Sequence, residues 1–458
     1  MQIEKNNVIH ITVMTVALKE KNMKFYDRET EIKALQTIEK HSAQNAQMTI
    51  VMGRRRVGKT ALLKHAFVST PMLYFFVEKK TEALLCEEFT RIIQSSLGVK
   101  IFGELKTFKT LFAYLMELSK TKNFTLIIDE FQEFTKINPS VFSEMQNVWD
   151  DNKNASKINL VICGSIYSIM KRIFESYKEP LFGRSTAKFY IKPFANSVIK
   201  QIISDKNSKY TTEDLLAFYT ITGGVAKYAE QLIDNNAITK KKIFDIIFSE
   251  GSYFLREGRD VLIDEFGKDY GIYYSILSLI ASSKTARSEI ESILGIDIGG
   301  YLERLEKDFN IIKRNRPFGA KEGSRNNKYK IEDNFLSFWF RFIYKYRSAI
   351  EIGNFDYVRD IVERDYETFS GLMLERYFRQ KLIESKEFSD IGSFWDRKGE
   401  CEIDIIAINE IEKRLCFYEV KRNKNKISLP ALQNKASEIV KQYPDYKIEY
   451  IGFSMDDM

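Results

Sequence analysis

The stretch Gly53-Arg54-Arg55-Arg56-Val57-Gly58-Lys59-Thr60 carries the most informative pattern in this chain. It fits GxxxxGK[ST] at every fixed position, after the apolar run 48–52 and before the helical stretch 61–67. In such a loop the glycines let backbone N–H groups curl around a phosphate, and the N-terminus of the next helix adds positive charge. A chance match is the alternative, but the strand before the motif and the helix after it argue against one. The pattern therefore predicts a phosphate-binding loop.

The loop also predicts how a nucleotide is held. We expect Lys59 to contact the β- and γ-phosphates of ATP, and the Thr60 hydroxyl to coordinate Mg²⁺. We expect Arg54, Arg55 and Arg56 on the surface of the loop, with contacts to nucleotide or to a neighbouring subunit as the alternative.

A second apolar run, 124–128, ends in two acids. These acids are Asp129 and Glu130, and together with a phosphate loop they are typical of nucleotide hydrolases. We expect Asp129 to hold the Mg²⁺ and Glu130 to polarise the attacking water.

Two further residues have two interpretations each. Ser165 follows the apolar run 160–163 and is either a sensor of the γ-phosphate or a turn serine. Arg184 is either an arginine finger that crosses a subunit boundary in a homo-oligomer or a surface arginine.

Size and composition limit the class of protein. The 458 residues suggest about three domains, and 44% hydrophobic with 29% charged residues suit a soluble protein. The net charge of +7 permits an anionic partner but does not require one. No apolar run is long enough to predict a membrane span. Four cysteines without a CxxC pair indicate reduced thiols and a cytoplasmic protein, and the three histidines all precede residue 66, which excludes a histidine metal cluster in later domains.

Element patterns divide the chain into five parts. Strand and helix signals alternate first, which predicts an α/β fold with a parallel sheet covered by helices. The expected parts are a non-exported N-terminal extension (1–24), a P-loop NTPase domain (25–195), a helical lid (196–265), a winged-helix domain with an aromatic helix (266–345) and a C-terminal restriction-endonuclease-like α/β domain (346–458).

The winged helix is predicted from element order. Helical patterns at 273–282, 288–295 and 300–308 precede two short strands at 311–314 and 328–331. Contact with DNA and a solvated charged hairpin are equally consistent with the basic residues there, which are Arg304, Lys307, Lys313, Arg314, Arg316, Lys321, Arg325 and Lys328.

The C-terminal part contains two acids and a lysine in a suggestive register. Its two apolar strands would form a hairpin centred between residues 411 and 412. Asp404 and Glu419 are equally far from that centre, so we expect them opposite each other, with Lys421 on the face of Glu419. Two acids can hold a divalent ion, and a lysine beside them can orient or deprotonate water for attack on a phosphodiester. A polar hairpin with an edge salt bridge is the alternative.

Several motifs together resemble those of the archaeal-type ATPases, in the AAA+/STAND branch of P-loop proteins. They are the segments 25–31, 53–60, 127–134 and 222–228, and the segment 329–340 resembles the uncharacterised domain that often follows this ATPase. The resemblance covers nearly the whole chain from about Phe25 and implies ATP binding. The family usually has a proline near its second glycine, where this chain has Ala226.

The C-terminal pattern resembles PD-(D/E)xK nucleases. The resemblance implies that Glu375, in the helical stretch 371–379, is the acid of the first helix and a further metal ligand, and that Gln433 is an additional contact. Ile403 stands where a proline is usual, a departure that the superfamily tolerates. Phosphate binding would use the basic residues nearby, which are Arg422, Lys424, Lys426, Lys435 and Lys441.

Three function classes remain open, with ATP and Mg²⁺ as the expected ligands. The first is an ATP-driven, DNA-directed protein with a metal-dependent nuclease domain. The second is a STAND-like regulatory switch that binds DNA or protein without cleavage. The third is a chaperone-like ATPase without a nucleic-acid role.

Overall fold

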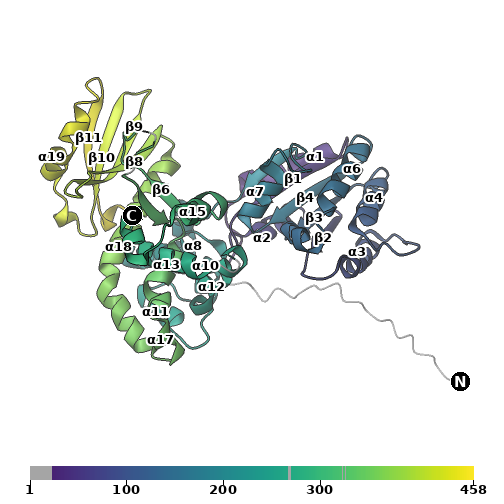
Figure 1. The fold of residues 1–458 in the computed structure, drawn as a ribbon, viewed down its shortest axis with the longest axis horizontal. Helices are drawn as coiled ribbons and strands as arrows, with labels where there is room; N and C mark the ends of the chain where they lie inside the picture. Colours follow the sequence, from purple (N-terminus) through teal and green to yellow (C-terminus); the bar gives the residue numbers. More distant parts are fainter. Residues whose placement is uncertain (1–22, 267–269, 322, 325) are drawn as a thin grey trace.

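The computed structural model describes residues 23–458 except 267–269, 322 and 325. Most of the expected N-terminal extension, and the basic residue Arg325, therefore lie outside the described residues. Within the described part of the chain, no helix has both the length and the apolar character needed to cross a bilayer. Figure 1 shows one sheet with its helices at one end of the molecule and a second sheet at the other, joined by a helical middle part.

Five parallel strands form the first sheet, as the alternating pattern predicted. Their order is β2-β3-β4-β1-β5, so β4 lies between the strand of the phosphate loop and the strand of the two acids. The three central strands are almost wholly buried, which explains their continuous apolar sequences. The strands are β1 (Gln47–Met52), β2 (Met72–Phe76), β3 (Phe124–Asp129), β4 (Ile158–Gly164) and β5 (Ala187–Tyr190).

Helices cover both faces of this sheet and bury two separate apolar cores. One face is covered by α1 (Glu29–Ser42) and α2 (Lys59–Ala66), whose Leu35 and Leu62 are buried. The other face is covered by α3 (Glu82–Leu97), α4 (Phe108–Leu118), the short η1 (Phe131–Glu133) and α5 (Phe134–Ile137), α6 (Val141–Asn152) and α7 (Tyr167–Glu175).

The middle of the chain is helical. Thr211 caps one of its helices through a capping box with Asp214, which satisfies two backbone N–H groups at the helix start. Gly224 lies so close to Phe194 that an added Cβ would come within 2.4 Å of the Phe194 carbonyl oxygen. The helices are α8 (Asn196–Lys206), α9 (Thr212–Thr222), α10 (Ala226–Asp234), α11 (Lys240–Ile247) and α12 (Tyr253–Phe266).

Three helices and an antiparallel hairpin follow, in the order expected for a winged helix. The assignment of these elements to that fold stays a prediction. They are α13 (Tyr270–Ala281), α14 (Arg287–Leu294), α15 (Gly299–Glu303) continued by the π-helical η3 (Arg304–Asp308), and the strands β6 (Ile312–Asn315) and β7 (Lys328–Ile331). The aromatic segment comes next as α16 (Asn334–Phe338), the π-helical η4 (Trp339–Tyr344) and α17 (Arg347–Glu351).

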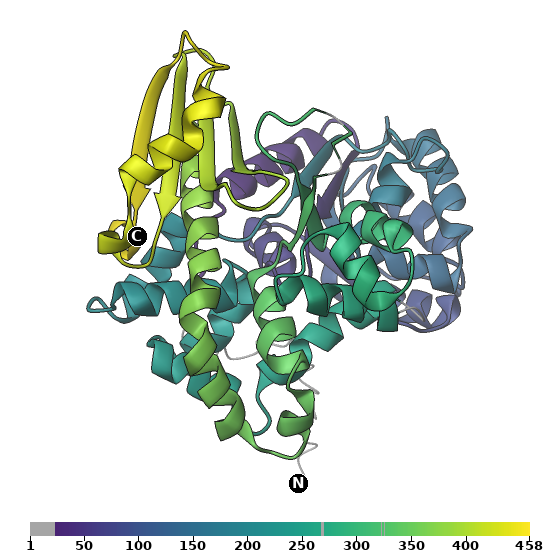
Figure 2. The same ribbon diagram turned by 60° about the vertical axis from the view of Figure 1, so that its left-hand side comes forward.

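A single long helix, α18 (Phe355–Ser385), leads into the second sheet (Figure 2). This sheet has the order β11-β10-β9-β8, with β10 and β11 parallel and the other pairs antiparallel. Its elements are β8 (Asp390–Trp395), β9 (Glu402–Asn409), β10 (Arg414–Val420), η5 (Lys424–Lys426), α19 (Leu429–Val440), β11 (Lys447–Phe453) and η6 (Met455–Asp457).

One apolar core runs from the middle helices through α18 to one face of the second sheet. Leu232 of α10, Phe338 of α16, Phe378 of α18 and Tyr418 of β10 all belong to it. The loop after β6 also docks on β8, where the Phe318 backbone N–H donates to the Ser393 carbonyl at 2.7 Å. The middle helices, the β6–β7 hairpin and the second sheet are therefore packed as one body.

We predict that Gly258→Ala lowers the free energy of unfolding by about 2 kcal/mol or more, because overpacking forces a core to shift. An added Cβ at Gly258, in α12, would lie 2.2 Å from the Trp339 ring. Gly371→Ala in α18 is the matched control, since its Cβ would meet open space. Replacing a helical glycine by alanine without a clash should raise the free energy of unfolding by about 1 kcal/mol, so Gly371→Ala should be slightly more stable than the parent. Thermal or urea unfolding of the two variants measures the difference, and equal effects would contradict the packing described here.

Candidate functional site

The carboxyl ends of three adjacent parallel strands bring the candidate nucleotide site together. The phosphate loop follows β1, Ser165 follows β4, and Asp129 ends β3 with Glu130 directly after it. Because parallel strands all end at the same edge of the sheet, these residues lie in a row in the order β1, β4, β3.

The phosphate loop has the backbone that its sequence predicts. Gly58 has φ +94°, in the left-handed region that favours glycine, and α2 begins directly after it. At Gly53 an added Cβ would lie 2.7 Å from the Ile191 carbonyl oxygen, so a side chain would clash there. Lys59 is buried, and its ammonium donates to the carbonyls of Gly53 and Arg54 at 2.8 and 3.0 Å. The loop is therefore folded around the lysine that is expected to contact phosphate.

Thr60 and Asp129 meet at the sheet edge and fit a Mg²⁺ ion bound with nucleotide. The Thr60 hydroxyl donates to Asp129 Oδ2 at 2.9 Å. The two side chains place a hydroxyl and a carboxylate oxygen together, and oxygen atoms are the ligands that Mg²⁺ prefers. The Tyr74 hydroxyl donates to the same Asp129 oxygen at 2.6 Å. Burial and the nearby Asp129 carboxylate raise the pKa of Tyr74, which keeps its hydroxyl a donor.

Glu130 is held in place by two donors. Its φ of 55° is unusual for a residue with a side chain, and this conformation turns the chain sharply after β3. Ser165 Oγ donates to Glu130 Oε2 at 2.7 Å, and the Gln132 amide donates to the same oxygen. Ser165 thus contacts the carboxylate expected to polarise water. Its role as a sensor of the γ-phosphate stays a prediction.

Arg184 lies away from this row. Its guanidinium donates to Asp150 Oδ2 from Nη2 at 2.8 Å and from Nε at 3.0 Å. Thr186, two residues later, donates its backbone N–H to the Met48 carbonyl near the start of β1. Arg184 is therefore near the amino ends of the strands, and a role as an arginine finger would need a second subunit.

Arg54 and Arg56 are partly exposed, and each pairs with a buried acid, a contact that the expected position on the loop surface did not include. Arg54 Nη1 forms an ion pair with Oδ2 of Asp333 at 3.2 Å, and Asp333 is the residue directly before α16. Arg56 Nε donates to Glu257 Oε1 of α12 at 3.0 Å. Both acids are buried, and both lie in the body that carries the second sheet. Packing between distant segments therefore decides where these two side chains lie.

Arg55 is the exposed member of the three. Its Nη1 donates to the Asp260 carbonyl of α12 at 3.2 Å. The loop thus contacts α12 through a second arginine besides the one paired with Glu257.

The start of α10 also touches the phosphate loop. The Lys227 backbone N–H donates to the Arg56 carbonyl at 3.1 Å, and an added Cβ at Gly58 would lie 3.4 Å from the Ala226 Cβ. The segment that resembles the Gly-Gly motif of the family therefore lies against the loop with alanine at the contact.

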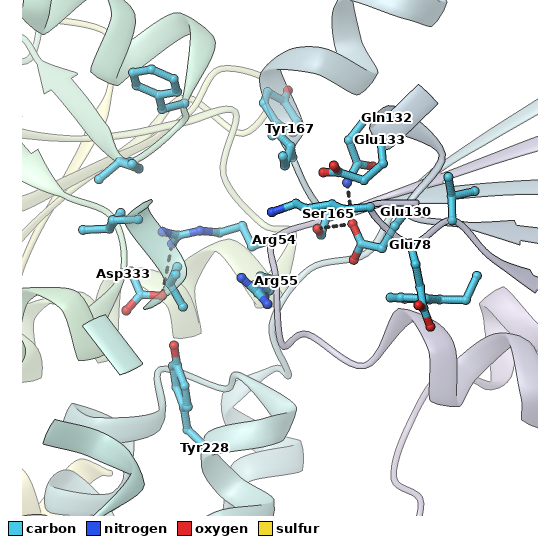
Figure 3. A pocket seen from close by; sticks show the side chains of 18 of the residues that line it. Arg54, Arg55, Glu78, Glu130, Gln132, Glu133, Ser165, Tyr167, Tyr228 and Asp333 are labelled. Atoms are coloured by element: carbon cyan, nitrogen blue, oxygen red, sulfur yellow. Dashed lines mark hydrogen bonds and ion pairs between the residues drawn. The ribbon is translucent and has the colours of Figure 1, made fainter. Parts of the chain in front are cut away.

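A cavity of ≈450 Å³ opens beside Glu130 and Ser165 (Figure 3). Its wall includes Glu130 and Ser165 on the sheet side, and Tyr228 and Asp333 on the opposite side. Ile311, directly before β6, also lines it. The first sheet, the middle helices and the β6–β7 hairpin region therefore all contribute to the wall of one cavity.

Tyr74, Gln132 and Asp333 contribute contacts to the site that the sequence did not predict. Gln132 and Asp333 lie inside motifs that resemble the family, so the motifs signalled them without indicating their contacts. Tyr74 is an ordinary aromatic residue of β2, and its contact with Asp129 depends on the pairing of β2 with β3.

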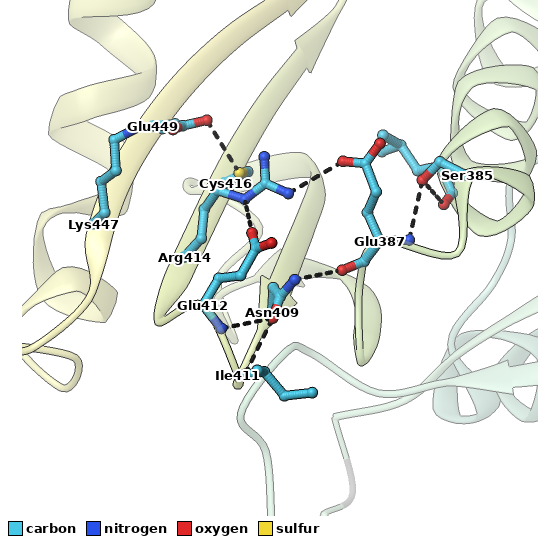
Figure 4. Close-up of polar contacts among 10 residues, drawn as sticks. Ser385, Glu387, Asn409, Ile411, Glu412, Arg414, Cys416, Lys447 and Glu449 are labelled. Carbon is cyan, nitrogen blue, oxygen red and sulfur yellow. Dashed lines mark hydrogen bonds and ion pairs between the residues drawn. The ribbon is translucent and has the colours of Figure 1, made fainter.

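The register expected for the C-terminal hairpin is confirmed. The β9–β10 pairs run from Asn409 opposite Arg414 to Ile405 opposite Tyr418, so Asp404 and Glu419 come next in the same register. Figure 4 shows how Asn409 fixes the turn, since its Oδ1 accepts from the backbone N–H groups of Ile411 at 3.1 Å and Glu412 at 2.9 Å. A side chain that satisfies the turn in this way favours a single register.

Lys421 joins the two acids. Its ammonium lies 3.3 Å from Asp404 Oδ2 and 3.6 Å from Glu419 Oε1. Burial lowers the pKa of Lys421, but Asp404 and Glu419 raise it more, so the amine is held as a cation. Asp404 also accepts from the Val420 backbone N–H at 2.8 Å, and Glu419 from that of Ser428 at 2.7 Å.

Glu375 lies on α18 near this hairpin, in the wall of a second cavity of ≈1120 Å³. Burial raises the pKa of Glu375 from 4.5 to about 7, and Lys330 opposes the shift while Asp404 adds to it. Among the described residues, no group of three or more His, Cys, Asp or Glu side chains is placed to hold a metal ion. Asp404 and Glu419 therefore offer two carboxylates to a metal. Glu375 interacts electrostatically with Asp404 and Lys421, and its role as a further ligand stays a prediction.

Several basic residues of the predicted winged helix have partners within the chain. Lys328 pairs with Glu402 at 2.9 Å, and Arg314 with Glu306 at 3.6 Å. Lys307 pairs with Glu303 at 2.7 Å and Arg304 with Asp308 at 4.0 Å. Of the basic residues named for this region and described by the structure, Lys313, Arg316 and the exposed Lys321 have no ion-pair partner, and the first two line the larger cavity.

Of the basic residues after β10, some form ion pairs within the chain and others are exposed. Arg422 pairs with Glu213 of α9 at 2.5 Å, and Lys441 with Glu438 at 2.6 Å. Lys424 and Lys426 are exposed on η5, Lys435 is half-buried on α19, and Gln433 of α19 is exposed. Arg422 therefore ties the second sheet to the middle helices rather than facing solvent.

Comparison with known proteins gives two family matches. A model described as an ATPase domain predominantly from Archaea matches residues 25–232. A model of archaeal and bacterial proteins of unknown function matches residues 339–438. An uncharacterised protein of Methanocaldococcus jannaschii is 33% identical over 410 residues, which are 87% of each chain.

Two solved structures are similar in fold. A Walker-type ATPase of Pyrococcus abyssi is 20% identical, with a TM-score of 0.52, over 69% of this chain and 96% of that one. The ORC2 protein of Aeropyrum pernix, solved in ADPNP and ADP complexes, is 13% identical, with a TM-score of 0.46, over 67% of this chain and 90% of that one. The first of these shows that the α/β fold with its parallel sheet is shared with a Walker-type ATPase.

We predict that the stability of the protein falls as pH rises through the range set by Glu375. The raised pKa means that the folded state binds the Glu375 proton more tightly than the unfolded state does. The stabilisation from this bound proton is fully present below about pH 4.5 and is lost as pH rises past about 7. Glu375 keeps some exposure to the cavity, so we expect an effect of about 1–2 kcal/mol. Glu375→Gln should remove that slope and be more stable than the parent at about pH 8.

Thermal unfolding over this pH range measures the effect. Glu367→Gln, which changes an exposed glutamate of the same helix, is the matched control and should keep the slope of the parent. An unchanged slope in Glu375→Gln would show that Glu375 titrates normally in the folded protein.

Proposed function

Because this chain belongs to the family whose ATPase domain occurs predominantly in Archaea, we propose that it binds ATP with Mg²⁺ and hydrolyses it at the edge of its parallel sheet. The observation that carries this proposal is the row of Thr60, Asp129, Glu130 and Ser165. Thr60 donates to Asp129 at 2.9 Å, and Ser165 donates to Glu130 at 2.7 Å.

Each residue of the row has a distinct task. Lys59 and the backbone N–H groups of the loop bind the phosphates, and Thr60 with Asp129 would hold Mg²⁺, which neutralises charge on the phosphates. Glu130 orients and polarises the attacking water. Ser165 and Gln132 keep the Glu130 carboxylate in one orientation, since both donate to the same oxygen.

We predict that Glu130→Gln lowers the rate of ATP hydrolysis by about 100-fold or more but leaves ATP binding in place, because the amide cannot accept a proton from water. Lys59→Ala should abolish turnover by weakening phosphate binding. Phosphate release and nucleotide titration measure the two effects. Glu117→Gln, an exposed acid on α4, is the control and should turn over like the parent. Parental turnover in Glu130→Gln would refute the role of Glu130.

We further propose a metal-dependent nuclease activity for the second sheet, directed at DNA and governed by the ATPase. The observation that favours it is the contact of Lys421 with both Asp404 and Glu419. Two carboxylates and a lysine can hold a divalent ion and orient water at a phosphodiester. Lys313 and Arg316, which line the larger cavity, would attract the DNA backbone.

A regulatory ATPase without cleavage is the alternative. It is favoured by the contacts of the phosphate loop with Glu257 and Asp333, which couple the nucleotide site to the rest of the chain whatever the second sheet does. The loop between β6 and β7 also favours a regulatory role, since it docks on β8 and covers that edge of the second sheet.

We predict that plasmid DNA is nicked in the presence of Mg²⁺ or Mn²⁺ and that Asp404→Ala loses this activity, because one of two carboxylates is removed. The assay is run with and without ATP, and a dependence on ATP would support coupling. Asp445→Ala, an exposed acid before β11, is the control and should cleave like the parent. An absence of metal-dependent nicking in the parent protein would favour the regulatory alternative and leave the ATPase proposal intact.

A further inference from the structure

We propose that Arg54 is a switch residue whose guanidinium is shared between Asp333 and the γ-phosphate of ATP, so that ATP, but not ADP, weakens the contact of the phosphate loop with the segment before α16. The inference rests on the proposed ATPase function and adds the regulation of the same site.

Arg54 links the phosphate loop to the segment before α16, because its backbone lies in the loop and its side chain reaches Asp333. Its carbonyl accepts from the Lys59 ammonium at 3.0 Å, within the loop that is expected to bind phosphate. Its guanidinium pairs with Asp333 Oδ2 at 3.2 Å, in the body that carries the second sheet. Arg54 also lines the ≈450 Å³ cavity together with Glu130 and Ser165, the residues expected around the γ-phosphate. One flexible side chain can therefore reach either anion.

The two anions compete unequally for the guanidinium. Asp333 has only Oδ2 to offer to Arg54, because its Oδ1 accepts from the Leu336 backbone N–H at 2.8 Å and caps α16. The terminal phosphate of ATP carries more charge and has oxygens enough to accept two guanidinium N–H groups at once. The cap also means that Asp333 keeps its position when Arg54 leaves. ADP has no γ-phosphate and leaves the ion pair intact.

The other loop arginines are less suited to this exchange. Arg56 is committed to the buried Glu257 through two bonds, at 3.0 and 3.3 Å, and lies over the Tyr253 ring. Arg55 is exposed and donates to a backbone carbonyl of α12. Arg54 combines a carboxylate partner, a partly exposed side chain and a place in both cavities.

The contact continues beyond Asp333 to the long helix. The next residue, Asn334, donates from Nδ2 to the Tyr219 carbonyl at 3.1 Å and accepts at Oδ1 from Arg376 of α18 at 3.2 Å. Arg379, about one turn further along α18, donates to the Asp404 carbonyl at 3.2 Å. Asp333 is therefore linked through its neighbour to α18, the helix that contacts the β9–β10 hairpin.

The test compares ATP and ADP binding in Asp333→Asn, made in the Glu130→Gln background so that ATP is not consumed. Asparagine keeps the helix cap and removes the charge. Without its competitor, Arg54 should bind the γ-phosphate more tightly, so the Kd for ATP should fall by about 5- to 10-fold while that for ADP changes less than about 2-fold. Adding Arg54→Ala to this variant should remove the gain.

Asp150→Asn is the matched control, since it breaks the ion pair of Arg184 at the opposite end of the same strands. It should leave the ratio of ATP to ADP affinity unchanged. An unchanged ratio in Asp333→Asn, with the unfolding temperature preserved, would overturn the switch. A Glu130→Gln parent that binds neither nucleotide would instead overturn the proposed ATPase function, and the switch with it.

Discussion

The parallel alignment of β3, β4 and β1 is the constraint on which the candidate site depends. Because all three strands end at one edge of the sheet, residues that are far apart in sequence become neighbours there. The β4 strand between the other two places Ser165 beside Glu130. A register shift of a single residue would exchange the side chains that face each layer of helices and would separate Thr60 from Asp129.

Some features could be predicted from the sequence because they are local. The phosphate loop is a short run of residues with glycines where the backbone needs them, and Gly58 adopts the expected left-handed conformation. The β9–β10 register followed from the symmetry of a hairpin, and Asn409 enforces it through turn contacts that lie within the hairpin itself. Local chemistry sufficed in both cases.

Other features depend on packing between distant segments and gave no sequence signal. The contact of Arg54 with Asp333 joins a loop near the start of the chain to a helix cap far beyond it, which no spacing rule indicates. Tyr74 donates to Asp129 because β2 pairs with β3. The continuous core from the middle helices to the second sheet likewise arises from aromatic residues whose pattern indicates burial but not the partner.

The length of α18 would turn a small tilt into a large displacement along the helix. At about 1.5 Å per residue its 31 residues extend for roughly 45 Å. Near its start, Arg359 donates to the Phe248 carbonyl and holds that end against the helices before α12. A tilt of about 5° around this end would carry Arg376 and Arg379 sideways by about 2 Å. That displacement would exceed the tolerance of a hydrogen bond, so the contact of Arg379 with the Asp404 carbonyl requires α18 to keep its position in the core.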